Sequence, residues 1–145
     1  MIIRQLSADD YSQWLSLWDQ YQSFYHVNIS TSVTEETYRR FLDPDEPIYC
    51  LVMESDGVLL GIVHYIFHRS TWTVGNYCYL QDLFIDPKQR AHGLGEKLID
   101  AVSKDAKANE CSRVYWLTQE TNYRARALYD RVADNAGFIQ YRKNL

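Results

Sequence analysis

An arginine and two glycines stand where a β-type run gives way to a helical pattern: Arg90, Gly93 and Gly95. Glycines let the backbone come close to a ligand, and the first N–H groups of a helix have no partner within the helix. These groups and the helix dipole attract anions, and Arg90 would add a full positive charge. The segment therefore predicts a phosphate-binding turn, although such glycines can also serve only to ease a strand-to-helix connection.

Two common nucleotide-binding motifs do not fit this segment. A P-loop requires Gly-Lys-Ser/Thr after its spaced glycine, whereas Gly95 is followed by Glu96 and Lys97. A dinucleotide-binding turn requires a further glycine where this chain has Leu98. The predicted phosphate site therefore belongs to another kind of protein.

The segment resembles the pyrophosphate-binding motif R-x-x-G-x-G of the GNAT superfamily of N-acetyltransferases, here preceded by Tyr79-Leu80-Gln81-Asp82-Leu83-Phe84-Ile85. Downstream, residues 122–138 are similar to the N-x-x-A-x-x-L-Y…G-F segment of that family, in the family's order. The 79–85 run and residues 116–122 look most like the polyamine acetyltransferases and relatives that modify small amines or basic proteins. The resemblance implies acetyl transfer from acetyl-CoA to a primary amine of a small molecule, such as a polyamine or amino acid, by direct attack in a ternary complex.

The resemblance also implies roles for individual residues. Backbone groups of Leu83 and Ile85 would pair with the pantetheine arm like an added strand. Tyr129 would act as the catalytic donor to the departing thiolate, whereas helix periodicity alone would make it a core residue. The implied cofactor-binding residues are Leu83, Phe84, Ile85, Arg90, Ala91, His92, Gly93, Leu94, Gly95, Glu96 and Asn122.

The catalytic base is where the chain departs from the polyamine enzymes. Those enzymes generally carry Glu-Asp where this chain has Gln81 and Asp82, and an amide cannot accept a proton. An ammonium group with a pKa of about 10.4 is neutral in roughly one molecule in 2,500 at pH 7, so some group must take its proton. Asp82 ranks first, although strand alternation places it on the face opposite Gln81 unless a β-bulge intervenes. His64, His68 and Glu120 are the alternatives.

Aromatic side chains beyond the first helix could wall a substrate cleft and hold a cation against their rings. We predict substrate binding by Tyr21, Phe24 and Tyr25, together with Gln81. His64 and His68 would share one face of a strand, but a third metal ligand is not evident in the sequence. No metal site is therefore expected.

Length and composition fit a single soluble domain over residues 1–145. The net charge of −4 argues against a nucleic-acid-binding protein, and no apolar run approaches the roughly 20 residues that span a bilayer. Cys50, Cys78 and Cys111 lack CxxC spacing, which fits a reducing compartment better than a disulfide or zinc site. We expect a cytoplasmic enzyme, as a homodimer, without membrane or nucleic-acid partners.

The elements that must position these residues follow from hydrophobic periodicity, capping pairs and turn signals. Capping boxes at Ser7 with Asp10 and at Ser32 with Glu35 each predict a helix start. The stretch from Tyr21 to Ser32 is expected to interrupt the helices. The predicted order is strand 2–6, helix from 7, helix 32–42, strands 48–54, 58–69 and 74–85, a long helix from about 94 to 106, strand 113–117, helix 122–134 and strand 137–141.

This mixed order predicts an α/β fold with one mixed central sheet of about six to seven strands flanked by four helices. The first strands should be antiparallel, and those after the long helix parallel. The resemblance implies that this is the GNAT fold, extending along nearly the whole chain.

Two other functions remain open. A protein acetyltransferase, acting on lysine side chains or N-termini, would need an open groove rather than a closed aromatic pocket. A non-catalytic acetyl-CoA-binding module would keep the same fold, and Gln81 in place of a glutamate is the feature that keeps that alternative open.

Overall fold

The computed structural model describes residues 1–90 and 92–145. Short 3₁₀ turns precede the first helix and follow the fourth strand. The helices and strands are β1 (Ile2–Gln5), α1 (Tyr11–Phe24), α2 (Thr31–Leu42), β2 (Ile48–Ser55), β3 (Val58–His68), β4 (Tyr77–Ile85), α3 (Leu94–Ala108), β5 (Arg113–Tyr115) and α4 (Tyr123–Val132).

The strands of the described residues form one five-stranded sheet in sequence order, from β1 to β5. The first three pairings are antiparallel and β4 pairs with β5 in parallel, which confirms the predicted mixed sheet. The predicted count of six to seven strands is wrong, because residues 137–141, all described, form no strand. Their apolar side chains Phe138, Ile139 and Tyr141 are exposed, so a β-type sequence here lacks a neighbouring strand to pair with.

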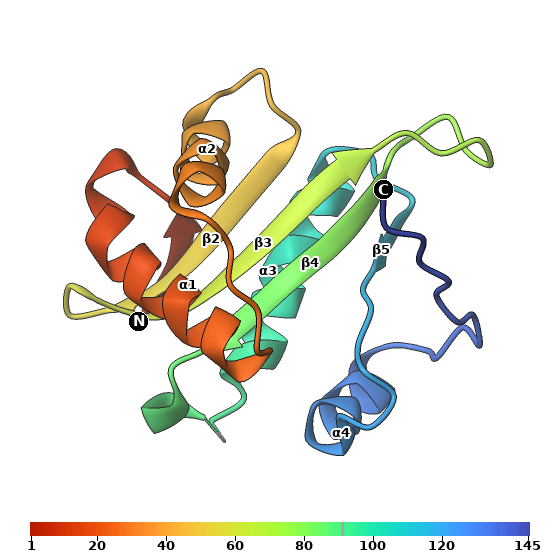
Figure 1. The fold of residues 1–145 in the computed structure, drawn as a ribbon. Helices are drawn as coiled ribbons and strands as arrows, with labels where there is room; N and C mark the ends of the chain where they lie inside the picture. Colours follow the sequence, from red (N-terminus) through yellow and green to blue (C-terminus); the bar gives the residue numbers. More distant parts are fainter. Residues whose placement is uncertain (91) are drawn as a thin grey trace.

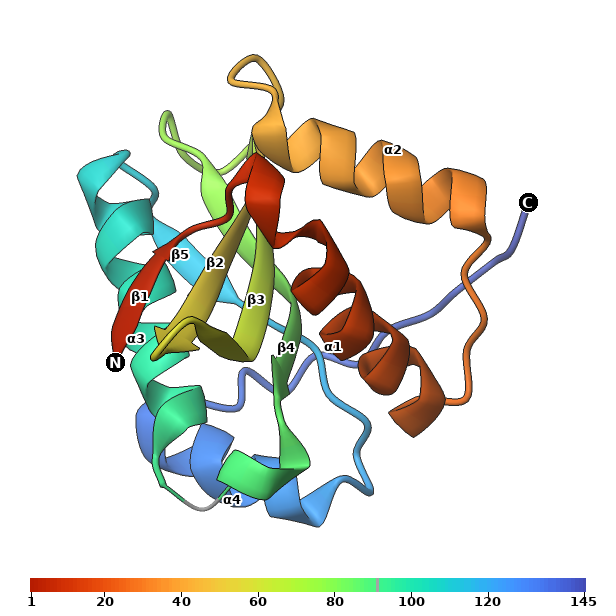
Figure 2. The same cartoon turned by 90° about the vertical axis from the view of Figure 1, so that its left-hand side faces the viewer.

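Helices α1, α2 and α3 cover the two faces of this sheet (Figure 2). α1 and α2 pack on one face, where Trp14, Trp18 and Tyr38 are buried. α4 lies apart from these layers, near the end of β4 (Figure 1). α3 packs on the opposite face and buries the apolar stripe predicted for it: Leu94, Leu98, Val102 and Ala106.

The first helix is longer than predicted and continues to Phe24. Aromatic packing supports the added turn, because Trp18 stacks on Tyr21 at 5.0 Å and Tyr21 contacts Tyr25 at 4.7 Å between ring centroids. The extension brings the Tyr21 hydroxyl within 2.6 Å of Asp82 on β4.

The second helix begins earlier than the capping pair of Ser32 and Glu35 predicted: its N-cap is Ser30. The hydroxyl of Ser30 accepts the backbone N–H of Val33 at 3.3 Å and caps the helix. Both serines offer a capping oxygen, and the helix uses the first of them.

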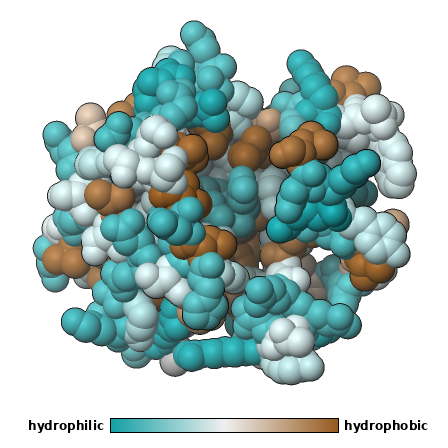
Figure 3. Space-filling view, in the orientation of Figure 1, coloured by the Kyte–Doolittle hydropathy of each residue, from teal (hydrophilic) through white to brown (hydrophobic). Residues whose placement is uncertain are grey.

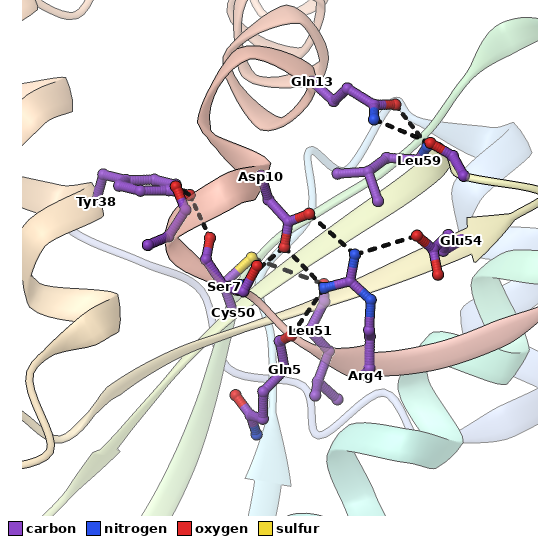
Figure 4. A network of polar contacts seen from close by, with 12 residues as sticks. Arg4, Gln5, Ser7, Asp10, Gln13, Tyr38, Cys50, Leu51, Glu54 and Leu59 are labelled. Atoms are coloured by element: carbon purple, nitrogen blue, oxygen red, sulfur yellow. Dashed lines mark hydrogen bonds and ion pairs between the residues drawn. The ribbon is translucent and has the colours of Figure 1, made fainter.

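A network of polar contacts fixes the start of α1 against β1 and β2 (Figure 4). The Arg4 guanidinium donates to Asp10 at 2.7 and 2.9 Å and to Glu54 at 3.3 Å. Asp10 also accepts the backbone N–H of Ser7 at 2.8 Å, as the predicted capping box requires. The hydrogen bond from Arg4 lowers the pKa of Asp10 to about 2. The helix that carries Trp14 and Tyr21 is thereby anchored to the sheet.

Candidate active site

A β-bulge in β4 decides which way its side chains face. Leu80 pairs with Tyr65 of β3, and Asp82 pairs with His64, the residue before Tyr65. Gln81 therefore has no partner on β3 and is the extra residue of the bulge. Leu80 packs in the core under α3, whereas Asp82 contacts α1. This is the β-bulge that the sequence analysis required for Asp82 to act as the base, because it turns Asp82 towards α1. The Gln81 side chain is exposed.

β4 and β5 separate along their length. Their parallel pairing ends where Tyr79 lies opposite Tyr115. Beyond that point, residues 80–85 have one backbone edge that is not paired with any strand of the described chain. An open edge offers N–H and C=O groups to an extended ligand. Leu83 and Ile85, the residues expected to bind a pantetheine arm, lie on this stretch.

Two glycines shape the start of α3, and each has a distinct structural reason. Gly93 is the N-cap with a φ of 71°, in the left-handed region that favours glycine. Gly95 allows α4 to approach, because a Cβ at this position would lie 3.3 Å from the side chain of Leu128. Among the described residues no side chain caps α3, so the N–H groups of its first turn are available to an anion.

The end of β4, the start of α3 and one side of α4 enclose a cleft of about 360 Å³. Figure 3 shows the surface hollowed between the sheet and the C-terminal part of the chain. The predicted site residues along its walls are Phe24, Tyr25, Leu83, Phe84, Ile85, Arg90, Gly93, Leu94, Gly95, Glu96, Asn122 and Tyr129. His92 is exposed and does not line the cleft, and the prediction for Ala91 lies outside the described residues.

Arg90 brings positive charge to the mouth of the cleft. Its guanidinium lies over the rings of Phe24 and Phe84, at 5.5 and 5.4 Å from their centroids. Its Nε also donates to the backbone carbonyl of Ile85 at 3.3 Å. These contacts hold the charge on the α1 side of the turn by cation–π packing.

α4 supplies the opposite wall of the cleft, and an ion pair joins it to α3. Asn122 caps the helix, since its Oδ1 accepts the backbone N–H of Ala125 at 3.3 Å. Arg131 pairs with Glu96 in the first turn of α3 at 2.7 Å, and both side chains are exposed. The side-chain amide group of Asn122 is the donor that this residue can offer to the cleft.

Tyr129 projects from α4 into the cleft and packs edge-on against Trp116, with ring centroids 5.4 Å apart. Burial raises the pKa of Tyr129 to about 12. The hydroxyl therefore stays protonated at neutral pH and can donate a hydrogen bond.

Asp82 accepts hydrogen bonds on both carboxylate oxygens. The Tyr21 hydroxyl donates to Oδ1 at 2.6 Å, and Nδ1 of His64 lies 2.9 Å from Oδ2. The indole N–H of Trp14 donates to Nε2 of the same histidine at 3.0 Å. The side chains of His64 and Asp82 are only 3% and 13% exposed. The sequence indicated Trp14 as a core residue alone, since helical spacing carries no sign of the histidine 50 residues away.

The remaining base candidates lie elsewhere. His68 contacts the Tyr115 hydroxyl at 2.8 Å and the backbone carbonyl of Arg69 at 2.7 Å. Glu120 is exposed in the turn before α4. The rings of Tyr79 and Tyr115 stack with their centroids 5.1 Å apart. Alternation before the bulge places Tyr79 on the same face of the sheet as Asp82. Sequence reasoning did not predict either tyrosine as part of the site. Only their β-type alternation could have indicated them, and it indicates core packing equally well.

Comparison with known proteins assigns the family. Residues 14–133 match the profile of the Acetyltransferase (GNAT) family. The chain belongs to the GNAT acetyltransferases.

Named relatives of this GNAT acetyltransferase act on amines. A D-amino-acid N-acetyltransferase of Saccharomyces cerevisiae is 31% identical over 99% of this chain and 91% of its own length. A thialysine N-epsilon-acetyltransferase of Bos taurus is 28% identical over 89% of this chain and 81% of its own. The structure of AAC(6')-Iy in complex with a CoA-containing bisubstrate analogue has the same fold, with a TM-score of 0.84 at 19% identity over 99% of this chain and 98% of that one.

Acetyl-CoA is the acetyl donor of the GNAT acetyltransferases, and the residues present fit it. The open edge at residues 80–85 suits an amide-containing arm, and the uncapped start of α3 at Gly93 suits a diphosphate. Within residues 1–90 and 92–145, no three His, Cys, Asp or Glu side chains are grouped so as to hold a metal ion. No helix in that part of the chain is long and apolar enough to cross a bilayer.

Proposed function

We propose that this GNAT enzyme transfers the acetyl group of acetyl-CoA to a primary amine of a small molecule by direct attack in a ternary complex. One juxtaposition carries the proposal: the open edge of β4, the start of α3 and Tyr129 share a cleft, and Tyr25 links it to Tyr21 and Asp82. The names of the yeast and bovine relatives favour an amino acid or a related small amine.

In this proposal Asp82 is the final acceptor of the amine's proton. Neutralising an ammonium group at pH 7 costs roughly 4.6 kcal/mol, so a positioned acceptor lowers the barrier substantially. The carboxylate and the tyrosine rings nearby, including Tyr21 and Tyr25, also favour a cationic acceptor molecule. Gln81, exposed and next to Asp82 in the chain, would contact the rest of that molecule.

Tyr129 is proposed to stabilise the departing sulfur. With the phenol pKa at about 12 and a thiol pKa near 8.5, full proton transfer would be uphill by roughly 5 kcal/mol. The hydroxyl is therefore better suited to donate a hydrogen bond to the developing negative charge. A free N–H on the edge near Leu83 could serve the carbonyl oxygen in the same way.

A panel of amines with detection of free thiol tests the proposed function. The purified protein is given acetyl-CoA with polyamines, D- and L-amino acids, thialysine, aminoglycosides or basic peptides. Release of CoA with a small amine is the expected result. Release with peptides alone would instead identify a protein acetyltransferase. Thermal stabilisation by acetyl-CoA without CoA release from any amine would identify a non-catalytic binding module.

The sequence-based expectations of one domain over residues 1–145, a cytoplasmic location and a homodimer belong to the same proposal. Light scattering on the purified protein measures the assembly directly.

A further inference from the structure

The hydrogen bond from Trp14 fixes the tautomer of His64. An indole nitrogen only donates, so Nε2 of His64 must accept with its lone pair. The proton of the neutral ring is then on Nδ1, which donates to Oδ2 of Asp82. A second proton on Nε2 would confront the Trp14 N–H at a site that is 3% exposed. His64 is thereby held as a neutral donor and is a poor destination for a proton that reaches Asp82.

The other oxygen of Asp82 is covered by Tyr21. That hydroxyl donates to Oδ1 at 2.6 Å, and the carboxylate itself is nearly buried. Tyr21 is only partly buried, and its ring lies 4.7 Å from that of Tyr25, which lines the cleft. From the cleft, Tyr25, Tyr21 and Asp82 therefore follow one another in contact, with the Tyr21 hydroxyl on the carboxylate.

We propose that Tyr21 relays the acceptor's proton to Asp82, while Trp14 acts through His64 as a positioning residue that keeps Asp82 the end of the relay. The inference rests on the proposed function. The ammonium N–H bond breaks as a new O–H bond forms on Tyr21. The original Tyr21 O–H bond breaks as its proton passes to Oδ1. The amine becomes neutral, Tyr21 is unchanged, and Asp82 ends protonated.

The two transfers occur together. Burial, with the neighbouring Asp82 charge, raises the pKa of Tyr21 above its ordinary range, so a free phenolate does not accumulate. The hydroxyl can accept a proton on its lone pair only as it gives up its own.

Tyr21→Phe tests the relay, with Tyr11→Phe as the matched control on the same helix. At about pH 7 the Tyr21 variant should lose about 100-fold in kcat/KM for the amine. At about pH 9.5 far more of the amine is already neutral, so the loss should shrink below about 10-fold. A merely structural role would give the same loss at both pH values. Tyr11→Phe should match the wild-type enzyme at both.

Burial favours the neutral form of three other titratable groups around the relay. They are Tyr25 from α1, Tyr79 from β4 and Cys50 from β2, and burial raises the pKa of each. His64 faces the relay from β3 through the contact of its Nδ1 with Asp82, and the Arg90 guanidinium lies over the rings of Phe24 and Phe84. The change in the Tyr21→Phe loss therefore reports on the amine.

Nitrogen-15 NMR of the histidine rings tests the Trp14 lock independently of activity. Wild-type His64 should show a protonated Nδ1 and an unprotonated Nε2 at neutral pH. Trp14→Phe removes only the donor to Nε2, so the Nε2 signal should shift towards that of a protonated nitrogen while Nδ1 stays protonated. Trp18→Phe should preserve the wild-type signals, because the buried indole N–H of Trp18 has no hydrogen-bond partner among the described residues. If Trp14→Phe does not fold, the wild-type spectrum alone decides, and a protonated Nε2 overturns the lock.

The outcomes separate this inference from the proposed function. If the wild-type enzyme releases no CoA with any amine, the proposed function fails and the relay with it. If the wild-type enzyme is active and Tyr21→Phe retains its kcat/KM, or loses the same factor at both pH values, only the relay is wrong.

Discussion

The wall of the cleft formed by β4 and α3 belongs to the packed core, whereas the wall formed by α4 lies outside it. The buried side chains of the described chain fall between Leu6 and Ala106. From Lys107 to Leu145, all described, none is buried. Tyr129 and Leu128 on α4 are only partly buried against the core. The enzyme thus places Asp82 in a fixed polar network and Tyr129 on a helix with few restraints.

This difference suggests that the two walls have different functions: one holds the groups that transfer protons, and the other closes on the bound ligand. Groups that must hold a proton at one atom need a rigid setting, because small displacements are costly in catalysis. A wall that closes on a bound ligand can be loosely packed and gain its order from the ligand. Four substitutions test whether the two walls differ in this way.

The largest loss is expected for Asp82→Asn, on the rigid wall. The amide keeps the size of the carboxylate but cannot accept a proton, so kcat/KM at about pH 7 should fall roughly 10²–10³-fold. Acetyl-CoA affinity, measured by calorimetry, should be unchanged, since Asp82 faces α1. Activity within a few-fold of the wild-type enzyme would remove Asp82 as the base.

Tyr129→Phe, on the loosely held wall, should lower kcat at least about tenfold with little change in acetyl-CoA affinity. Only the hydroxyl is removed, and the packing on Trp116 is kept. With the pKa of Tyr129 at about 12, the high-pH limb of the wild-type rate profile should not come from this group. Unchanged turnover would contradict its catalytic role.

Gly93→Asp should weaken acetyl-CoA binding about tenfold or more, because a carboxylate would stand beside the anion at the start of α3. Gly57→Asp is a matched control: Gly57 and Gly93 have φ values of 78° and 71°, and a Cβ added at either position would meet no atom within 4 Å. Both variants carry the same backbone penalty, but only Gly93 is near the cleft. Equal affinities for the two variants would discredit the phosphate turn.

The local parts of this architecture were predictable from sequence because short-range chemistry determines them. The stripe from Leu94 to Ala106 specifies the buried face of α3. Asp56 and Gly57 specify the β2–β3 turn, where both have positive φ. Residues 137–141 show the limit: local β-propensity predicted a strand, but a strand also needs a neighbour, which is not a local property.

The site divides in the same way. The turn at Gly93 could be predicted because its glycines and helix start are contiguous. The Asp82 network could not, because Tyr21 and His64 lie 61 and 18 residues from it in sequence. The bulge at Gln81 is equally hidden, since no glycine or proline marks it and only the pairing with β3 reveals the extra residue.

The smallest effect on function is expected for Leu128→Ala, and it most directly contrasts the two walls. Leu128 packs against Gly95 at the edge of the cleft, so its loss should cost only about 1 kcal/mol of unfolding free energy but weaken acetyl-CoA binding roughly threefold. Leu98→Ala, in the fully buried stripe of α3, should instead cost about 2–5 kcal/mol and leave affinity unchanged. Denaturant titration and calorimetry measure both quantities. Equal destabilisation by the two variants would mean that α4 is as firmly packed as the core. It would then contradict the idea that acetyl-CoA binding orders the α4 wall.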